Sequence, residues 1–361
     1  ARIYLATATP GDREMVARST SAVAQLMPLS ACANVKQLED RKAPPPQLAE
    51  VAAQLSKELA QSRGIALAGR VNEARPQLDG LAVRTSQLKL PALEAEVRES
   101  LGELLLLERD FAAARVEHEK GVRAAEIAAD DATAARLLAR MVSLVGWRLN
   151  NPEEGRTWAA LASGVLERAG GDLETEARIE EGLGDVEWQA GNRAESLAAY
   201  RRSLALYRQA VTEETLDVAR LHSSVGWVLT EQGDFDTARK ELEASRMIRE
   251  RLLGPEHPAL GDTWNELGSL AAEMREYDEA VRCEEKSRHV VEGMPRRYDV
   301  AEVSIAQMLI FAGRAGEATE IMERPREPSM KSSTPATWLE YGRMRILYLL
   351  GVGRPREALA E

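Results

Sequence analysis

Apolar and small residues recur at helical spacing along most of the chain, in a pattern that repeats about every 41 residues. Each unit predicts a helix, a tight turn and a second helix, because apolar positions three and four residues apart share one helix face. A period of this length is typical of a repeat architecture rather than of separate domains. The equivalent small residues on the second helices are Ala74, Ala114, Gly155, Ser196, Ala238, Ala280, Ala318 and Ala358.

Glycines at two further positions support this division. In five of the eight units a glycine precedes the small residue by five positions, where a left-handed backbone would end the first helix. Another glycine recurs seven residues earlier, inside the first helix, where it costs about 1 kcal/mol relative to alanine. We expect these inner glycines to mark places where two helices approach too closely for a Cβ. They are Gly102, Gly184, Gly226 and Gly268.

The first 46 residues differ from the repeats. Residues 12–26 have an amphipathic pattern that predicts a short helix, and Ala43-Pro44-Pro45-Pro46 predicts a stiff linker. We expect residues 47–361 to form about eight helical hairpins, with a longer loop at 325–335 and a truncated last repeat. The chain has no initiating Met and stops within an expected helix, so we interpret it as part of a longer protein.

Composition excludes several classes of function. Acidic residues outnumber basic ones, 58 to 47, and no basic patch with interleaved aromatics is present, which disfavours a nucleic-acid partner. No apolar run approaches the roughly 18 residues of a membrane span. Cys32 and Cys283 are far apart and form no CxxC pair, a usage typical of a reducing cytoplasm.

No candidate catalytic or metal chemistry is visible. The four histidines have no zinc-site spacing, and no phosphate-binding loop or nucleophile elbow is present. His118 follows Ala114 by four residues, which is a core position of the second helix. Acidic pairs such as Glu153-Glu154 are interpreted as solvated helix faces. The sequence therefore predicts no enzyme activity, cofactor or metal site in this part of the protein.

Residues 253–290 carry a family resemblance. Leu-Gly-Pro-Glu-His-Pro at 253–258, Asn-Glu-Leu-Gly at 265–268 and Tyr-Asp-Glu-Ala at 277–280 resemble tetratricopeptide repeats, specifically the 42-residue variety of kinesin light chains. The resemblance covers roughly 47–361 and is strongest at 175–290. It implies an all-α, right-handed superhelix of helical hairpins, an α-solenoid, whose first helices line a concave groove.

The order of segments is similar to a second family. The stretch at 28–35, the proline linker and the repeats resemble the C-terminal part of bacterial, myxobacterial-type serine/threonine protein kinases. A kinase domain would precede these repeats, and none of its motifs lies in this chain.

Tryptophans and arginines on the first helices form the candidate site. In the tetratricopeptide fold that the resemblance implies, their positions face the groove, where Trp and Arg supply much interface energy and Arg favours acidic segments. The alternative is that the tryptophans fill space between repeats. Trp264 is instead assigned to the packed core. The predicted groove residues are Arg140, Trp147, Arg178, Trp188, Arg220, Trp227 and Asn265.

The expected function is protein–protein interaction, with a protein or acidic peptide as ligand. The resemblance places the chain as the sensing or target-recruiting half of a bacterial serine/threonine kinase. A stand-alone adaptor or scaffold, and the sensor half of a large transcriptional regulator, stay open as alternatives. Self-association through the last repeat is also open, because an apolar face around Leu347, Leu349 and Leu350 would need a cover.

Overall fold

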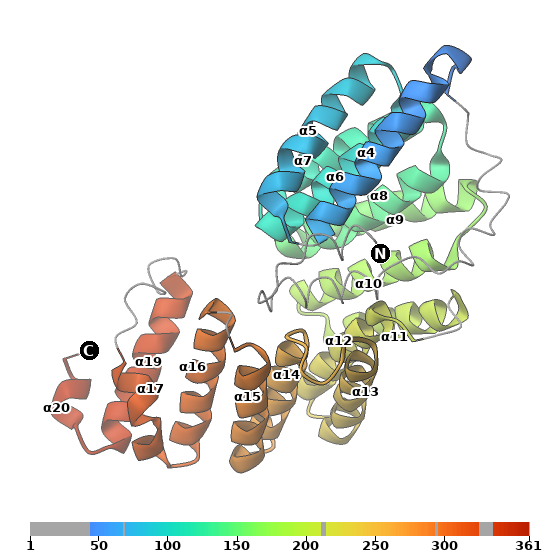
Figure 1. Ribbon diagram of the computed structural model, residues 1–361. Helices are drawn as coiled ribbons and strands as arrows, with labels where there is room; N and C mark the ends of the chain where they lie inside the picture. Colours follow the sequence, from blue (N-terminus) through green and yellow to red (C-terminus); the bar gives the residue numbers. More distant parts are fainter. Residues whose placement is uncertain (1–43, 68, 211–213, 293–294, 325–334, 361) are drawn as a thin grey trace. The chain divides into compact units, whose positions relative to one another are not determined.

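The computed structural model describes residues 44–67, 69–210, 214–292, 295–324 and 335–360. The expected N-terminal helix at 12–26 and residues 325–334 of the expected loop lie outside these ranges. The three prolines of the expected linker lie within them, and the last of these begins a short 3-10 helix, Pro46–Leu48. Within them the chain is helical and contains no strand (Figure 1). The all-α array of helical hairpins is therefore confirmed.

The helices form successive hairpins of a first and a second helix. The described elements are η2 (Pro46–Leu48), α4 (Ala49–Leu67), α5 (Val71–Gln87), α6 (Pro91–Glu108), α7 (Phe111–Ala128), α8 (Asp131–Ser143), η3 (Leu144–Arg148), α9 (Pro152–Arg168), α10 (Leu173–Gln189), α11 (Arg193–Ala210), α12 (Leu216–Gln232), α13 (Phe235–Leu253), α14 (Leu260–Glu273), α15 (Tyr277–Val290), α16 (Pro295–Phe311), η4 (Ala315–Ala318), α17 (Thr319–Glu323), α19 (Pro335–Gly351) and α20 (Pro355–Ala358). After α16, the short helices η4 and α17 take the place of a continuous second helix. In the third hairpin, the first helix α8 ends in the π-helix η3.

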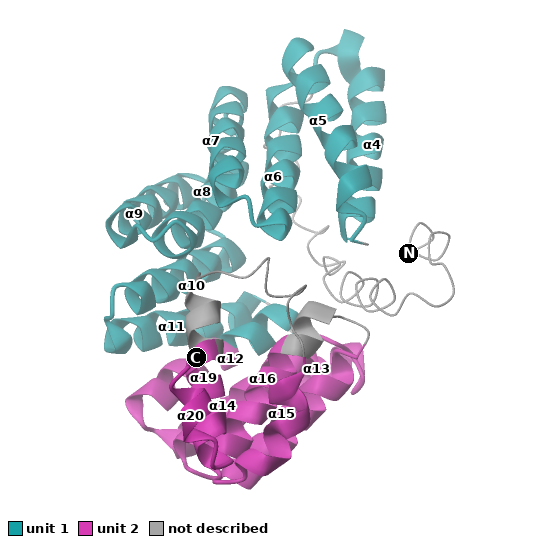
Figure 2. Cartoon of the chain, turned by 90° about the vertical axis from the view of Figure 1, so that its left-hand side faces the viewer, with its two compact units in different colours: residues 1–221 teal, residues 222–361 magenta. Residues whose placement is uncertain are grey.

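The chain divides into two compact units, residues 1–221 and residues 222–361 (Figure 2). The boundary falls within α12. Unit 1 contains the hairpins from α4 to α11, and unit 2 contains those from α14 to α20 together with α13.

Close contacts inside the hairpins explain the four inner glycines. A Cβ on Gly184 would lie 2.5 Å from the ring of Tyr200, and one on Gly226 would lie 2.7 Å from Leu242. Such distances exclude any larger residue unless the partner moves. The expectation is confirmed at all four positions, and each partner follows the small residue of the second helix by four. The other two partners are His118, which is fully buried as predicted, and Glu284.

The turn between the two helices has the same backbone in every repeat. The five predicted glycines all have positive φ, for example 86° at Gly191. In the other three repeats the equivalent residue adopts the same left-handed conformation without being glycine: φ is 63° at Arg109, 55° at Asn150 and 61° at Arg275. Turn geometry is thus set by the repeat even where the residue type opposes it.

Candidate partner-binding surface

A stripe of polar and aromatic side chains runs along one face of the first helices. In α10 its members are Arg178, Glu181, Asp185 and Trp188, whose spacing places them on a single helix face. We call this surface in unit 1 the first-helix stripe. Its other members are Glu99 and Glu103 of α6, Arg136, Arg140 and Ser143 of α8, Trp147 of η3 and Arg220 of α12.

Contacts within the stripe join residues about one repeat apart. Arg136 donates to both carboxylate oxygens of Glu99, at 2.9 and 3.0 Å, from the neighbouring first helix. Ser143 of α8 donates to Asp185 of α10. Each of these bonds joins side chains of two successive first helices and so fixes the register between them. Because the groups are partly shielded from water, the bonds are weakened less by screening than exposed ones.

Glu99 shows how strongly this network is charged. Its side chain is only 8% exposed, and Arg140 lies 3.2 Å from it in addition to Arg136. Burial alone would raise the pKa of the Glu99 carboxyl, but the guanidinium of Arg136, with Arg140, outweighs burial and holds that pKa well below its usual range. Glu99 is therefore ionised at neutral pH and neutralises arginines that face the stripe.

The three arginines predicted for the groove all have acidic neighbours in the chain itself. Arg140 contacts Glu99 and donates to Glu103 at 2.5 Å. Arg220 pairs with Glu181 of α10 and with Asp217 at 2.7 Å. Arg178 lies 3.8 Å from Glu174. The prediction placed them correctly on first helices, but their charge is already shared with carboxylates of this chain.

The tryptophans divide into two groups. Trp147 and Trp188 are half-buried on the first-helix stripe, and Trp227 of α12 is 38% exposed in unit 2. Trp158 and Trp264 are also half-buried, and each packs against a buried cluster. Trp264 therefore lies beside the core and not fully within it as expected, and its ring also contacts Arg246 and Lys286. The side chain of Trp338 lies outside the described residues.

Trp147 and Trp188 are each covered by an arginine. The guanidinium carbon of Arg148 lies 3.5 Å from the centroid of the Trp147 ring, and that of Arg193 lies 5.0 Å from Trp188. Such cation–π contacts contribute about 0.5–1 kcal/mol at exposed sites and orient the guanidinium. Neither arginine was singled out by the sequence, which shows only that each lies near a tryptophan.

The remaining predicted residue, Asn265, belongs to unit 2 together with Trp227. The amide of Asn265 donates to Glu284 at 2.9 Å and reaches Ser304 of α16 at 3.5 Å. In the same unit, Ser223 of α12 donates to Glu266 of α14 at 2.7 Å. The first helices of unit 2 are therefore joined by polar contacts of the same kind as those of unit 1.

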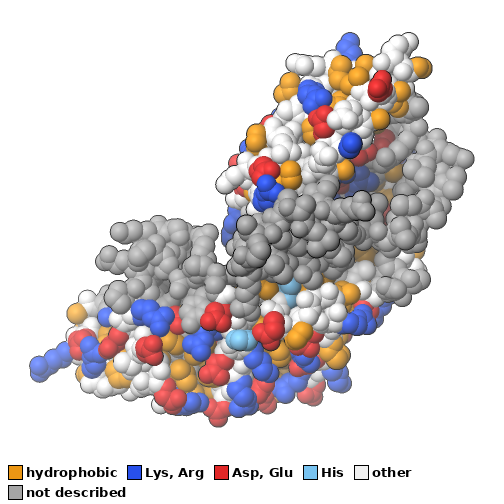
Figure 3. Space-filling model, in the orientation of Figure 1, with side chains coloured by type: hydrophobic (Ala, Val, Ile, Leu, Met, Phe, Trp, Pro, Cys, Tyr) orange, Lys and Arg blue, Asp and Glu red, His pale blue; other side chains and the backbone are white. Residues whose placement is uncertain are grey.

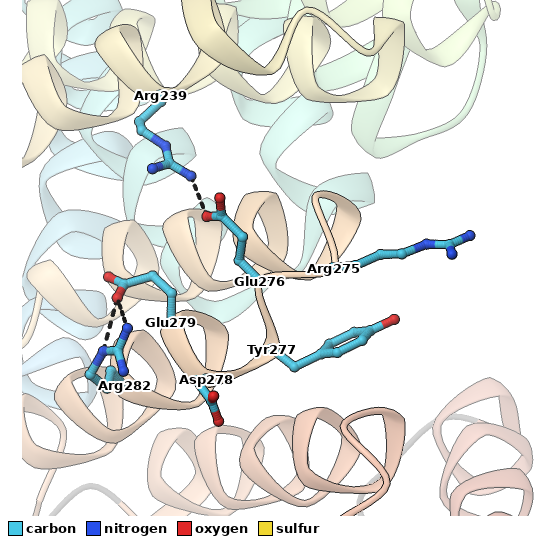
Figure 4. Close-up of a pocket in the computed structure, with 7 residues that line it drawn as sticks. All are labelled: Arg239, Arg275, Glu276, Tyr277, Asp278, Glu279 and Arg282. Atoms are coloured by element: carbon cyan, nitrogen blue, oxygen red, sulfur yellow. Dashed lines mark hydrogen bonds and ion pairs between the residues drawn. The ribbon is translucent and has the colours of Figure 1, made fainter.

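A hollow of about 350 Å³ lies at the turn between α14 and α15 (Figure 4). Its charged side chains are largely paired: Arg239 contacts Glu276 at 2.6 Å, and Arg282 contacts Glu279 at 2.5 Å. In Figure 4 Arg275 and Tyr277 extend to the opposite side from these pairs. On the face drawn in Figure 3, basic and acidic side chains are interspersed over the helices of unit 2. This surface has no concentration of one charge.

The described residues contain neither a candidate metal site nor a helix that could span a membrane. Within them, no group of three or more His, Cys, Asp and Glu side chains is placed to hold a metal ion. Across the same ranges, every helix is too short or too polar to cross a membrane.

Comparison with known proteins supports the repeat assignment. Residues 217–291 match the tetratricopeptide repeat family model, so the chain contains a tetratricopeptide repeat region. No curated protein matches the chain. A Pyrococcus horikoshii signal transduction ATPase with numerous domains and a tetratricopeptide repeat sensor has a TM-score of 0.62 at 12% identity. The match covers 99% of this chain and 50% of that one.

Two further solved structures have similar folds. A Rap protein complexed with competence and sporulation factor has a TM-score of 0.58 at 13% identity, over 96% of this chain and 95% of its own. Aspartyl phosphate phosphatase F from Bacillus subtilis has a TM-score of 0.51 at 14% identity, over 85% and 82%. At these identities the likeness concerns the fold alone.

Proposed function

We propose that this chain is a protein-binding module and that the first-helix stripe of unit 1 holds a peptide or partner helix. The observation that carries the proposal is the pair Trp147 and Trp188, half-buried on adjoining repeats and each covered by an arginine. Tryptophan and arginine dominate the energy of protein interfaces, and half-buried rings have apolar area left to bury.

The ion pairs and hydrogen bonds of the stripe support this function because they keep its helices in a fixed arrangement. Because Glu99 with Arg136 and Ser143 with Asp185 join neighbouring first helices, the two tryptophans keep a fixed separation before a ligand arrives. A preorganised surface loses less entropy on binding than a mobile one. A Rap protein of similar fold, solved in complex with competence and sporulation factor, supports the capacity of such an array to hold a ligand.

Within a longer protein, the module is the regulatory or target-recruiting half of a cytoplasmic bacterial serine/threonine kinase. The support is the sequence resemblance around residues 28–35, the linker and the repeats. A second candidate is the sensor of a signal transduction ATPase, favoured by the Pyrococcus horikoshii protein, half of which aligns with this chain. Purified natural protein decides between them: phosphate transfer to serine or threonine favours the first, and nucleotide hydrolysis without transfer favours the second.

Selection from a phage-displayed random peptide library tests the binding surface. We expect the wild-type chain to enrich a peptide family whose binding is lost in Trp188→Ala. Met247→Ala is the control, because Met247 is 57% exposed on a second helix, outside the stripe. Helicity by circular dichroism must be equal in both variants. Enriched peptides that bind Trp188→Ala as tightly as wild type would show that the stripe is not the binding surface.

A further inference from the structure

We propose that Arg148 forms a carboxylate-binding site at the turn end of the first-helix stripe, which takes an acidic side chain of the bound peptide. This inference rests on the proposed function and adds the chemistry of the ligand. It also moves the acidic-ligand site away from the three arginines that the sequence favoured, because those arginines contact carboxylates of the chain.

The backbone presents Arg148 through a local change of helix type. Residues 144–148 form a π-helix, in which the amide of Leu149 donates to the carbonyl of Leu144 at 3.0 Å. Short π-helical turns inside α-helices are frequently found at functional sites. At this turn the guanidinium of Arg148 folds back over the ring of the preceding residue, Trp147. The carbon of that guanidinium is also 5.8 Å from the ring of Phe111.

Neither Arg148 nor the exposed Arg109 forms a close ion pair among the residues that the structure describes, although the charge of Asp185 acts on Arg148. Neither arginine makes a side-chain hydrogen bond there. The acidic groups nearby are engaged elsewhere: Asp185 accepts hydrogen bonds from Ser143 and, at 2.7 Å, from Tyr200. Asp110 accepts the amide of Ala113 at 3.1 Å as the cap of α7.

One acidic and one basic group, Asp185 and Arg109, act on the charge of Arg148. Burial lowers the pKa of the Arg148 guanidinium, Asp185 opposes that effect and the positive charge of Arg109 adds to it. Arginine remains protonated despite such shifts, so both arginines keep their positive charge at neutral pH. The stripe arginines Arg136 and Arg140, by comparison, share the carboxylate of Glu99.

The geometry of Arg148 selects a carboxylate. The guanidinium of Arg148 lies over the Trp147 ring, and the N–H groups at the edge of the guanidinium plane can still donate hydrogen bonds. Two parallel N–H donors match the two oxygens of a carboxylate. The chain carries a net charge of −11, so it repels acidic peptides in general, and capture of one requires a local site of this kind.

Fluorescence anisotropy with two labelled peptides tests the site. The probe is fluorescein-(Gly-Glu)4-amide, which carries only side-chain carboxylates, and the comparison peptide is fluorescein-(Gly-Gln)4-amide. We expect the wild-type chain to bind the Glu probe at least 10-fold more tightly, and Arg148→Gln to lose about 10-fold or more of that affinity. Arg148→Lys, which keeps the charge but not the two parallel donors, should recover only part of it.

Arg202→Gln is the matched control, because Arg202 lies on a second helix, is 55% exposed and pairs with Glu180. It should bind the probe within twofold of wild type. Equal affinity for the two peptides, or equal losses in Arg148→Gln and Arg202→Gln, would overturn the site. Library-selected peptides that need Trp188 but bind Arg148→Gln normally would overturn this inference and leave the proposed function standing.

Discussion

Replacing Glu284 with leucine is expected to stabilise unit 2, by an amount that grows between pH 5 and pH 8. Glu284 occupies a core position of α15 and is fully buried. One carboxyl oxygen accepts a hydrogen bond from Asn265 at 2.9 Å, and the other has no partner among the described residues. Burial raises the pKa of this carboxyl to about 8, against the opposing effect of Asn265.

Leucine fits this position because the previous repeat already contains it. Leu242 packs 2.7 Å from the Cβ site of Gly226, and Glu284 packs 2.8 Å from that of Gly268. The exchange therefore removes a buried carboxyl without requiring the hairpin to open. It also adds apolar burial, which does not depend on pH.

The pH dependence follows from proton binding in the two states. Below the ordinary pKa of 4.5 the carboxyl is protonated both folded and unfolded. As pH rises the unfolded chain ionises while the folded chain keeps its proton, so wild-type stability falls until the folded pKa near 8 is passed. A shift of this size corresponds to about 5 kcal/mol in total, or about 1.4 kcal/mol per pH unit.

Urea denaturation of both proteins at pH 5, 6, 7, 8 and 9 measures this difference. The advantage of Glu284→Leu should rise through pH 8 and then level off. Glu285→Gln is the control, since it removes a negative charge from an exposed position of the same helix. A leucine advantage that stays constant within about 0.5 kcal/mol from pH 5 to 9 would refute the argument that Glu284 is buried with its proton.

Three further predictions use thermal or urea denaturation. Gly184→Ala should lose about 1–3 kcal/mol because its Cβ would meet Tyr200, whereas Gly164→Ala, with nothing within 4 Å, should gain up to about 1 kcal/mol; equal effects would contradict the close contact. Burial lowers the pKa of His118, so wild-type stability should fall as pH drops below about 6.5, where the unfolded chain binds the proton more readily. His118→Leu should abolish that fall; if stability falls equally with pH in the variant, His118 is not its cause. Arg275→Gly should gain about 0.5–1 kcal/mol by relieving a φ of 61°, and a loss would show that the arginine side chain outweighs the strain.

The hairpins could be predicted from the sequence because their determinants are local. Helix periodicity, a small residue on each second helix and glycine at the close contacts all recur in phase along the chain. The core position of His118 followed from the same phase and is confirmed, whereas Trp264 is only partly buried beside its cluster. Even the turn backbone at Arg109 and Arg275 obeys the repeat rather than the residue type.

The candidate surface could be predicted only in part. The sequence located two tryptophans and three arginines of the stripe on first helices, which is a matter of phase within one helix: Trp147, Trp188, Arg140, Arg178 and Arg220. Whether an arginine is available to a ligand depends on what the next hairpin places against it. Arg140 meets Glu99, 41 positions earlier in the chain, and Arg220 meets Glu181, 39 positions earlier.

Arg148 could not be identified as a site residue from the sequence, for the same reason. It is exposed in a π-helical turn and forms no close ion pair among the described residues, while the nearby Asp185 accepts hydrogen bonds from Ser143 and Tyr200. The sequence by itself determined the repeat, its core and the face that carries the tryptophans, because these depend on neighbours within one hairpin. Only the tertiary structure decided which charges are neutralised, because Coulomb interactions and hydrogen bonds act over a few ångströms between residues that lie about 40 positions apart.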